Sequence, residues 1–264
     1  MPHSLIDIGA NLTHDSFAED FNAVLERAAA VGIEQMIVTG SSDQGNIDAA
    51  ELADAHPGRL FSTAGVHPHH AAEYTDASDE LIRSLLLRDA VVAVGECGLD
   101  YFRDISPRDV QREAFQSQLE IAADTGMPVF LHQRDAHDDF VALLKPALAK
   151  IPRAVAHCFT GDGDAMREYL EMGLWIGITG WICDERRGLH LQEIVSEIPD
   201  DRLLIETDAP YLMPRTLRPK PKTRRNEPAH LPEVVRVVAA ARGQSEAHVA
   251  AITTANAIEF FALP

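Results

Sequence analysis

The stretch VVAVGECGLD, Val91–Asp100, sets an acidic residue at the end of a buried strand. Its β-branched run VVAV is of the kind that packs as a fully buried parallel strand. Glu96 follows Gly95 directly, and a carboxylate in such a dry place is costly unless a cation or hydrogen-bond donors meet it. For one isolated glutamate, a helix cap or a salt-bridged loop acid is the simpler interpretation. Several other expected strands are also followed by a histidine or a carboxylate, and this repetition changes the interpretation.

Short apolar runs alternate with longer amphipathic segments from end to end. The expected strands are Leu5–Ile8, Ile33–Thr39, Leu60–Ala64, the run inside Val91–Asp100, Met127–Leu131, Arg153–Ala156, Leu174–Ile178 and Arg202–Ile205. The expected helices are Phe17–Val31, Gln44–Ala55, Asp79–Arg88, Pro107–Thr125, His137–Lys150, Asp164–Met172, Leu189–Glu197, Leu231–Ala241 and Ser245–Phe260. This alternation predicts an α/β protein, a (β/α)8 TIM barrel, with residues 1–264 as a single domain. A doubly wound sheet is the alternative, but it would not gather so many strand ends at one site.

The charge of the chain restricts how it could hold a polyanion. There are 23 basic and 41 acidic residues among 264, which gives a formal net charge of -18. A broad, non-specific grip on nucleic acid is therefore disfavoured, and a phosphate substrate must be met by a metal or by a local basic cluster. No signal peptide and no apolar run of ~20 residues is found, so we expect a cytoplasmic protein without a membrane segment.

Ligand-type side chains follow the expected strands, where barrel enzymes place their reactive groups. In chain order they are Asp7, His67, His69, Glu96, His132, His157 and Asp208. Imidazole and carboxylate together suit Zn, Mn or Fe, whereas Mg prefers carboxylate, water and phosphate oxygens. Satisfied core polar groups are an improbable explanation for four such residues on four strands. The sequence thus predicts a metal site formed by Glu96, His132, His157 and Asp208.

Other polar residues near these strand ends leave alternatives open. His67 and His69 flank Pro68 and could contact substrate, bind metal or hold the loop. Asp7 could be a ligand, although a role as an acceptor that orients a histidine is the safer interpretation. Arg134 is placed to meet an anion, or to pair with the adjacent Asp135.

The segment 209–228 is the longest expected irregular piece, and it concentrates positive charge. It contains Arg215, Arg218, Lys220, Lys222, Arg224 and Arg225, opposed only by Glu227. A charge run of this kind is usually a solvated loop, but this one borders Asp208 in sequence, which favours phosphate recognition. Tyr101, Trp181 and Tyr211 could offer faces for stacking an unpaired base.

Seven motifs spread over essentially the whole chain carry a resemblance to a known family. They are AGVHPH, VGECGLD, PVFLHQRDA, VAHCFTG, IGITGW, LLIETDAPYL and RRNEPAHLP. Together they resemble the TatD family of metal-dependent deoxyribonucleases. The resemblance implies a barrel of the metal-dependent hydrolase type, 3'-to-5' exonuclease action preferring single strands, a divalent metal commonly taken as Mg, and a link to DNA repair. By motif position, Glu96, His132, His157 and Asp208 would be metal ligands or their immediate catalytic partners.

One departure from the family pattern concerns the first strand. Many relatives carry an H-x-H pair there, whereas this chain reads DIGAN from Asp7 to Asn11. Glycine cannot ligate a metal, and Asn11 offers only a neutral amide oxygen. The metal position that those histidines would hold is weakened or lost, so one or two ions are expected.

These observations predict a metal-dependent nuclease that acts on single-stranded DNA or RNA as a monomer. Glu96 would bridge the ions if two are bound, and Asp208 would be the general base. Mg is the first candidate for the metal, with Mn or Zn as alternatives. The expected substrate contacts are His67, His69, Arg134, Arg224 and Arg225. The alternative is a hydrolase of small amides, esters or lactones on the same barrel, and a non-enzymatic alternative is a binding module that keeps the scaffold.

Overall fold

The computed structural model describes residues 2–264, in which strands and helices alternate along the chain. Eight strands in this range follow one another in the sheet in the order β1 to β8. The pairs β3–β4, β4–β5, β5–β6 and β7–β8 are parallel. The predicted (β/α)8 barrel class is confirmed. Among these residues no helix combines the length and the apolar character required to cross a membrane.

The strands are β1 (Leu5–Ala10), β2 (Ile33–Val38), β3 (Leu60–Ala64), β4 (Val91–Asp100), β5 (Val129–Arg134), β6 (Ala154–Ala156), β7 (Trp175–Ile178) and β8 (Leu203–Ile205). The α-helices are α1 (Phe21–Ala30), α2 (Asp43–Asp54), α3 (Asp76–Leu85), α4 (Arg108–Thr125), α5 (His137–Ala147), α6 (Gly163–Glu171), α7 (Leu189–Ile194), α8 (Leu231–Arg242) and α9 (Glu246–Phe261). Short 3-10 turns include η2 (Pro68–Glu73) and η3 (Gly180–Cys183).

The described chain divides into two compact units. The central unit comprises Val38–His157 with Glu171–Trp175. The terminal unit comprises the described residues up to Ile37, Cys158–Leu170 and Ile176–Pro264. The prediction of a single domain over residues 1–264 stays a prediction.

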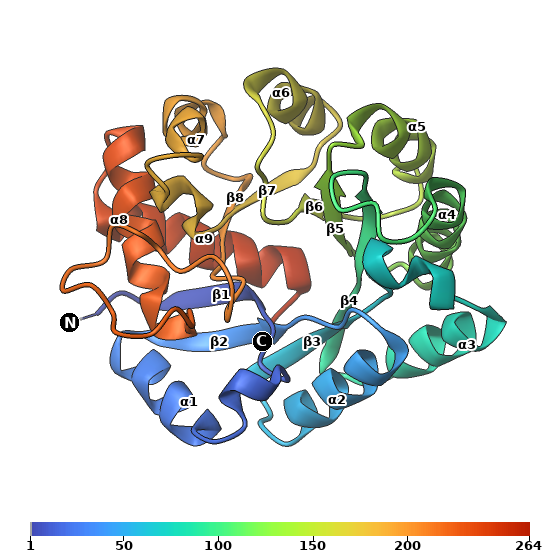
Figure 1. Cartoon of the computed structure of the whole chain (residues 1–264), viewed down its shortest axis with the longest axis horizontal. Coiled ribbons are helices and arrows are strands. Elements are labelled where there is room, and N and C mark those ends of the chain that lie inside the picture. The colour runs from blue at the N-terminus through green and yellow to red at the C-terminus, as the bar shows by residue number, and fades with distance from the viewer. Residues whose placement is uncertain (1) are drawn as a thin grey trace. The chain divides into compact units, whose positions relative to one another are not determined.

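In the central unit, the middle strand β4 is buried along all of its ten residues. Helices α4 and α5 lie beside β4 and β5 on their outer side (Figure 1). The rings of Phe115 on α4 and Phe140 on α5 stack with centroids 5.5 Å apart. A strand that is covered on both faces reads as a continuous apolar run, and this explains the VVAV start of β4.

In the terminal unit, β1 is tied to the segment that follows β8. The Asn11 N–H donates to the Ala209 carbonyl at 2.7 Å, and the Asp208 N–H donates to the Gly9 carbonyl at 2.8 Å. The side chain of Asn256 on α9 donates to the Leu203 carbonyl at 2.8 Å. The first two bonds hold the segment after β8, and with it Asp208, against β1, and the third joins the start of β8 to α9.

Three strands run further than the sequence predicts, and β1 continues to Ala10 where Ile8 was expected as its last residue. Strand β4 continues to Asp100 and β5 to Arg134, because parallel pairing persists through Gly98 with His132 and Asp100 with Arg134. Polar residues had suggested loops there, although a polar residue can stay in a strand while ladder bonds are available. Glu96 and His132 therefore lie inside strands.

Several helix starts also differ from expectation, and the largest shift is at α1, which begins at Phe21 and not at Phe17. Helix α3 begins at Asp76 because Thr75 and Ser78 form a capping box. Helix α4 was expected from Pro107 but begins at Arg108, and Pro107 holds the N-cap position, so that Ser106 lies outside the helix. The Ser106 hydroxyl instead donates to the His69 carbonyl at 3.0 Å and so fixes the turn that carries His69.

Candidate metal centre

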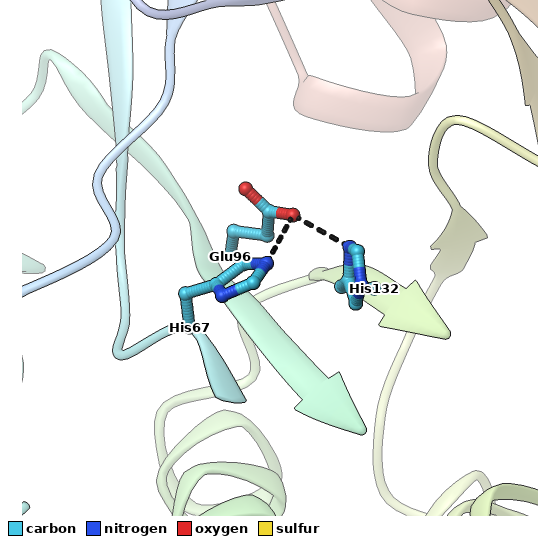
Figure 2. A group of neighbouring side chains, drawn as sticks. All are labelled: His67, Glu96 and His132. Atoms are coloured by element: carbon cyan, nitrogen blue, oxygen red, sulfur yellow. Dashed lines mark ion pairs between the residues drawn. The ribbon is translucent and has the colours of Figure 1, made fainter. Parts of the chain in front are cut away.

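Four of the predicted side chains meet in the central unit. His67 follows β3, Glu96 lies on β4, His132 on β5, and His157 comes directly after β6. Because neighbouring strands are parallel, their carboxyl ends lie at one edge of the sheet and bring these side chains together. Figure 2 shows the Glu96 carboxylate between the rings of His67 and His132.

One carboxylate oxygen, Glu96 Oε1, is the focus of the group. It lies 2.9 Å from His157 Nε2, 3.0 Å from His132 Nδ1 and 3.4 Å from His67 Nε2. A divalent cation with ligands at about 2.0–2.2 Å keeps neighbouring ligand atoms about 3 Å apart. The distances from Glu96 Oε1 to His157 Nε2 and to His132 Nδ1 fit neighbouring ligands of a cation, and the described residues whose ligand atoms all lie within 4.8 Å of one another are His67, Glu96 and His132.

Close packing of β4 against β5 gives Glu96 its place. Gly98 has a φ of +144°, and a β-carbon there would lie 1.9 Å from the His132 carbonyl oxygen. Only glycine permits this approach of the two backbones. The Phe130 ring packs on the His157 ring with centroids 4.5 Å apart, which fixes the orientation of that imidazole.

The hydrogen bonds of each histidine indicate whether it can bind a metal or instead donates a hydrogen bond. His67 Nδ1 accepts the His69 N–H at 3.1 Å, so in neutral His67 the hydrogen sits on Nε2, which faces Glu96. A metal-binding histidine has the reverse arrangement, with its other ring nitrogen donating. Although the ligand atoms of His67, Glu96 and His132 lie within 4.8 Å of one another, His67 is therefore arranged as a hydrogen-bond donor.

His132 has the arrangement of a ligand. Its Nδ1 faces Glu96, and its buried Nε2 makes no hydrogen bond of good geometry but lies 3.4 Å from Asp100 Oδ2. A carboxylate behind a metal-binding imidazole holds the tautomer and raises the basicity of the ligand nitrogen. Glu96, His132 and His157 supply the donor types that a divalent cation accepts, and the facing nitrogens of the two histidines lie 3.0 and 2.9 Å from Glu96 Oε1.

The pKa shifts at the centre follow from burial and charge. Burial would raise the pKa of Glu96, but the facing His157, His67 and His132 outweigh it and hold this pKa well below its usual range. Burial lowers the pKa of His67 to about 4, so its imidazole is neutral near pH 7. Burial would also lower the pKa of His132, but the carboxylates of Asp100 and Glu96 raise it. The centre thus stabilises positive charge beside its two carboxylates.

Asp100 belongs to the site but was missed in the sequence. It is 2% exposed, and its Oδ2 lies 2.8 Å from His69 Nε2. Burial would raise the pKa of Asp100, but His132 and His69 lower it far below its usual range. The signal for Asp100 in the sequence was its spacing from Glu96. Every second residue of a strand points to the same face, so residues 96, 98 and 100 share one.

Asp7 and Asn11 of the first strand region lie in the terminal unit. The buried Asp7 accepts the Thr207 N–H at 2.9 Å and the Thr207 hydroxyl at 2.5 Å. The Asn11 amide donates to Asp208 Oδ1 at 3.0 Å. Asp7 thus braces the segment after β8, and Asn11 orients Asp208. Whether Asp208 serves the metal centre stays a prediction.

Glu206, one residue after β8, is a second buried acid that sequence reasoning did not single out. It is 0% exposed, and its Oε1 accepts the Cys158 N–H at 2.6 Å. Cys158 directly follows His157 and has a φ of +45°. The position of Glu206 in the motif ETDAP was the signal available in the sequence. No spacing in the sequence indicated that the Cys158 N–H would be its partner.

The predicted substrate-binding arginines have different surroundings. The Arg134 guanidinium lies over the Phe102 ring, 4.0 Å from its centroid. Arg224 is exposed, whereas Arg225 donates to Asp20 Oδ1 and to the Ser16 carbonyl, both at 2.6 Å. These bonds anchor Arg225 to the segment before α1, so its side chain supports the loop. Whether Arg225 also contacts substrate stays a prediction.

Comparison with known proteins agrees with this geometry. The family described as TatD related DNase matches residues 6–262. A protein of Musicola paradisiaca named 3'-5' ssDNA/RNA exonuclease TatD is 52% identical over 259 residues, which cover 98% of each chain. A protein of the same name from Dickeya dadantii is 54% identical over 240 residues, or 91% of each chain. The crystal structure of YJJV, a TatD homolog from Escherichia coli, superposes with a TM-score of 0.89 at 29% identity over 98% of both chains. The chain belongs to the TatD-related DNase family.

Proposed function

We propose that this protein is a metal-dependent nuclease that removes nucleotides from the 3' end of single-stranded DNA or RNA. The observation that carries the proposal is the convergence of three imidazoles on Glu96 Oε1 at 2.9–3.4 Å. The polarity and the substrate come from relatives at 52% and 54% identity that bear the name 3'-5' ssDNA/RNA exonuclease.

Glu96, His132 and His157 would hold the metal. A divalent cation at this position lowers the pKa of a water molecule and polarises a phosphoryl oxygen. The low pKa of Glu96 keeps its carboxylate ionised, as ligation requires. Two neutral imidazoles and one carboxylate favour Mn or Zn over Mg, because Mg prefers oxygen ligands.

The remaining polar groups act on substrate and water. Neutral His67 directs its Nε2–H into the centre, where it can donate to a phosphate oxygen. Asp208 is the proposed general base, on the argument that it follows β8 and that barrel enzymes use strand ends. Its carboxylate is oriented by the Asn11 amide at 3.0 Å. His69 and Arg134 beside the centre, with the exposed Arg224, would position the strand.

The test is release of 3'-terminal nucleotides from a 5'-labelled single-stranded oligonucleotide by protein stripped of metal. We expect no release in chelator and recovery on adding Mn or Mg, with shortening from the 3' end. An oligonucleotide blocked at its 3' end and a neutral ester are the controls. Equal turnover of the blocked strand would contradict the polarity, and turnover of the ester alone would favour the small-molecule hydrolase. Monomeric state, cytoplasmic location and a part in DNA repair stay sequence-based predictions.

A further inference from the structure

The loop that follows β4 presents an aromatic ring to solvent beside the metal centre. Phe102 is 55% exposed. The guanidinium of Arg134 lies 4.0 Å from the centroid of its ring, so one face is covered by a cation. Since more than half of the residue is still exposed, the ring keeps open surface for another flat group.

The position of Phe102 is set by residues of the metal centre. The Phe102 N–H donates to Asp100 Oδ1 at 3.0 Å, and the Arg103 N–H donates to the same oxygen at 2.8 Å. The other oxygen of Asp100 lies 2.8 Å from His69 Nε2 and 3.4 Å from His132 Nε2. One buried carboxylate therefore holds the His69 imidazole and the start of the exposed loop, and it lies behind the His132 ring.

Arg134 is placed by the same pair of strands. It pairs with Asp100 in the sheet, and its carbonyl accepts the Tyr101 N–H at 2.9 Å. Arg134 lies two positions after His132 on the extended strand, a span of about 7 Å. The ring of Phe102 and the guanidinium of Arg134 thus lie just beyond the ligands, at the ends of β4 and β5.

We propose that Phe102 and Arg134 form a stacking subsite for the unpaired base next to the phosphodiester bond that is hydrolysed. The inference rests on the proposed nuclease function and adds the group that recognises a single strand. Every base has a π-face, so stacking on an aromatic ring holds any sequence, whereas a base inside a duplex is already stacked and paired. A ring with arginine on one face is a rigid platform of this kind. In a chain with a net charge of -18, such local contacts replace general attraction to the phosphates.

The experiment compares Phe102→Ala with Leu87→Ala, a change at another exposed apolar residue, which precedes β4 and so lies at its other end. We expect Phe102→Ala to lower kcat/KM for single-stranded DNA by about tenfold, the typical size of one lost stack. Phe102→Trp should retain the parent value, and Leu87→Ala should leave it unchanged. Thermal melting of each variant verifies the fold.

A second substrate separates stacking from other effects. On an oligonucleotide that lacks its 3'-terminal and neighbouring bases, the parent and Phe102→Ala should have the same kcat/KM, because there is no base to stack. An equal loss on both substrates, or no loss beyond that of Leu87→Ala, would overturn the subsite while leaving the nuclease intact. A parent protein that releases no nucleotide from any single strand would refute the proposed function itself.

Discussion

Two buried carboxylates, Glu96 in the central unit and Asp7 in the terminal unit, have opposite surroundings. Asp7 meets neutral donors, the N–H and the hydroxyl of Thr207 and, at 3.3 Å, the N–H of Gly9. Glu96 meets imidazole nitrogens of three histidines. Burial raises the pKa of Asp7 to about 7, whereas the histidines outweigh burial at Glu96 and lower its pKa. Burial alone does not identify a metal ligand, and the partners of the carboxylate decide its role.

The largest effect is expected for Glu96→Gln. An amide cannot supply the charge that balances a divalent cation, so nucleotide release should fall by more than about 100-fold and calorimetry should detect little Mn binding. Glu73→Gln is the matched control, since that glutamate side chain is 74% exposed and pairs with His70 outside the centre. A Glu96→Gln variant that keeps Mn affinity and activity would remove the distinction between the two carboxylates.

Asp100→Asn should have the next largest effect on metal binding, because it weakens the support behind His132 and leaves the ligands in place. We expect the Kd for Mn to rise by about 10–100-fold, as for other groups behind metal-binding histidines. Asp104→Asn serves as control, since Asp104 lies in the loop that follows Asp100 and pairs with Arg108 at 3.0 Å. If both variants bind Mn like the parent, Asp100 does not orient His132.

The variant Asp7→Asn tests the second carboxylate of the comparison, and the quantity measured is the free energy of unfolding. The pKa of Asp7 is about 7 when folded against 3.8 for an ordinary aspartate, so its protonated form favours the fold. That contribution is complete below about pH 4 and is lost as the pH rises towards 7, a change of about 4 kcal/mol at ~1.4 kcal/mol per pKa unit. Asparagine mimics the protonated acid and does not titrate.

We therefore expect the Asp7→Asn variant to match the parent at pH 4 and to be the more stable protein at pH 8, in denaturant unfolding with chelator present. Its affinity for Mn should equal that of the parent. A large loss of Mn affinity in the Asp7→Asn variant would instead show that Asp7 is a metal ligand, as is proposed for Glu96.

The smallest effects are expected for the two neighbouring arginines of the loop after β8. Arg225 is bonded to Asp20 at 2.6 and 2.8 Å, so Arg225→Ala should cost about 1 kcal/mol of stability. Arg224 is exposed, so Arg224→Ala should weaken DNA binding and lower the slope of affinity against salt by roughly one ion. If Arg224→Ala lowered stability and Arg225→Ala weakened DNA binding, the hydrogen-bond partners of an arginine in this loop would not predict its role.

Much of the fold was predictable because local pattern and tertiary structure agree. The VVAV run and its equivalents predicted buried parallel strands, and the barrel class is confirmed. Strand ends were less predictable, since Gly98 and Asp100 have polar or flexible character but stay paired with β5. The family prediction is confirmed as well, by a match over residues 6–262.

The candidate site was predictable in its members more than in their roles. Glu96, His132 and His157 were expected together and lie together. The donor role of His67 depends on its bond with the His69 N–H, and the role of Asp100 depends on the register between two strands. Such contacts join residues distant in sequence or settle a tautomer, and a linear pattern contains neither.

By itself the sequence determined which residue types follow which strands, and therefore the barrel class, the family and the presence of a His and carboxylate centre. Only the tertiary structure decided which ring nitrogen faces Glu96, which buried acid meets neutral donors, and which arginine is bonded to the scaffold. The physical reason is that residue type sets what a group can donate or accept, whereas its pKa and its partners depend on burial and on atoms brought near by folding.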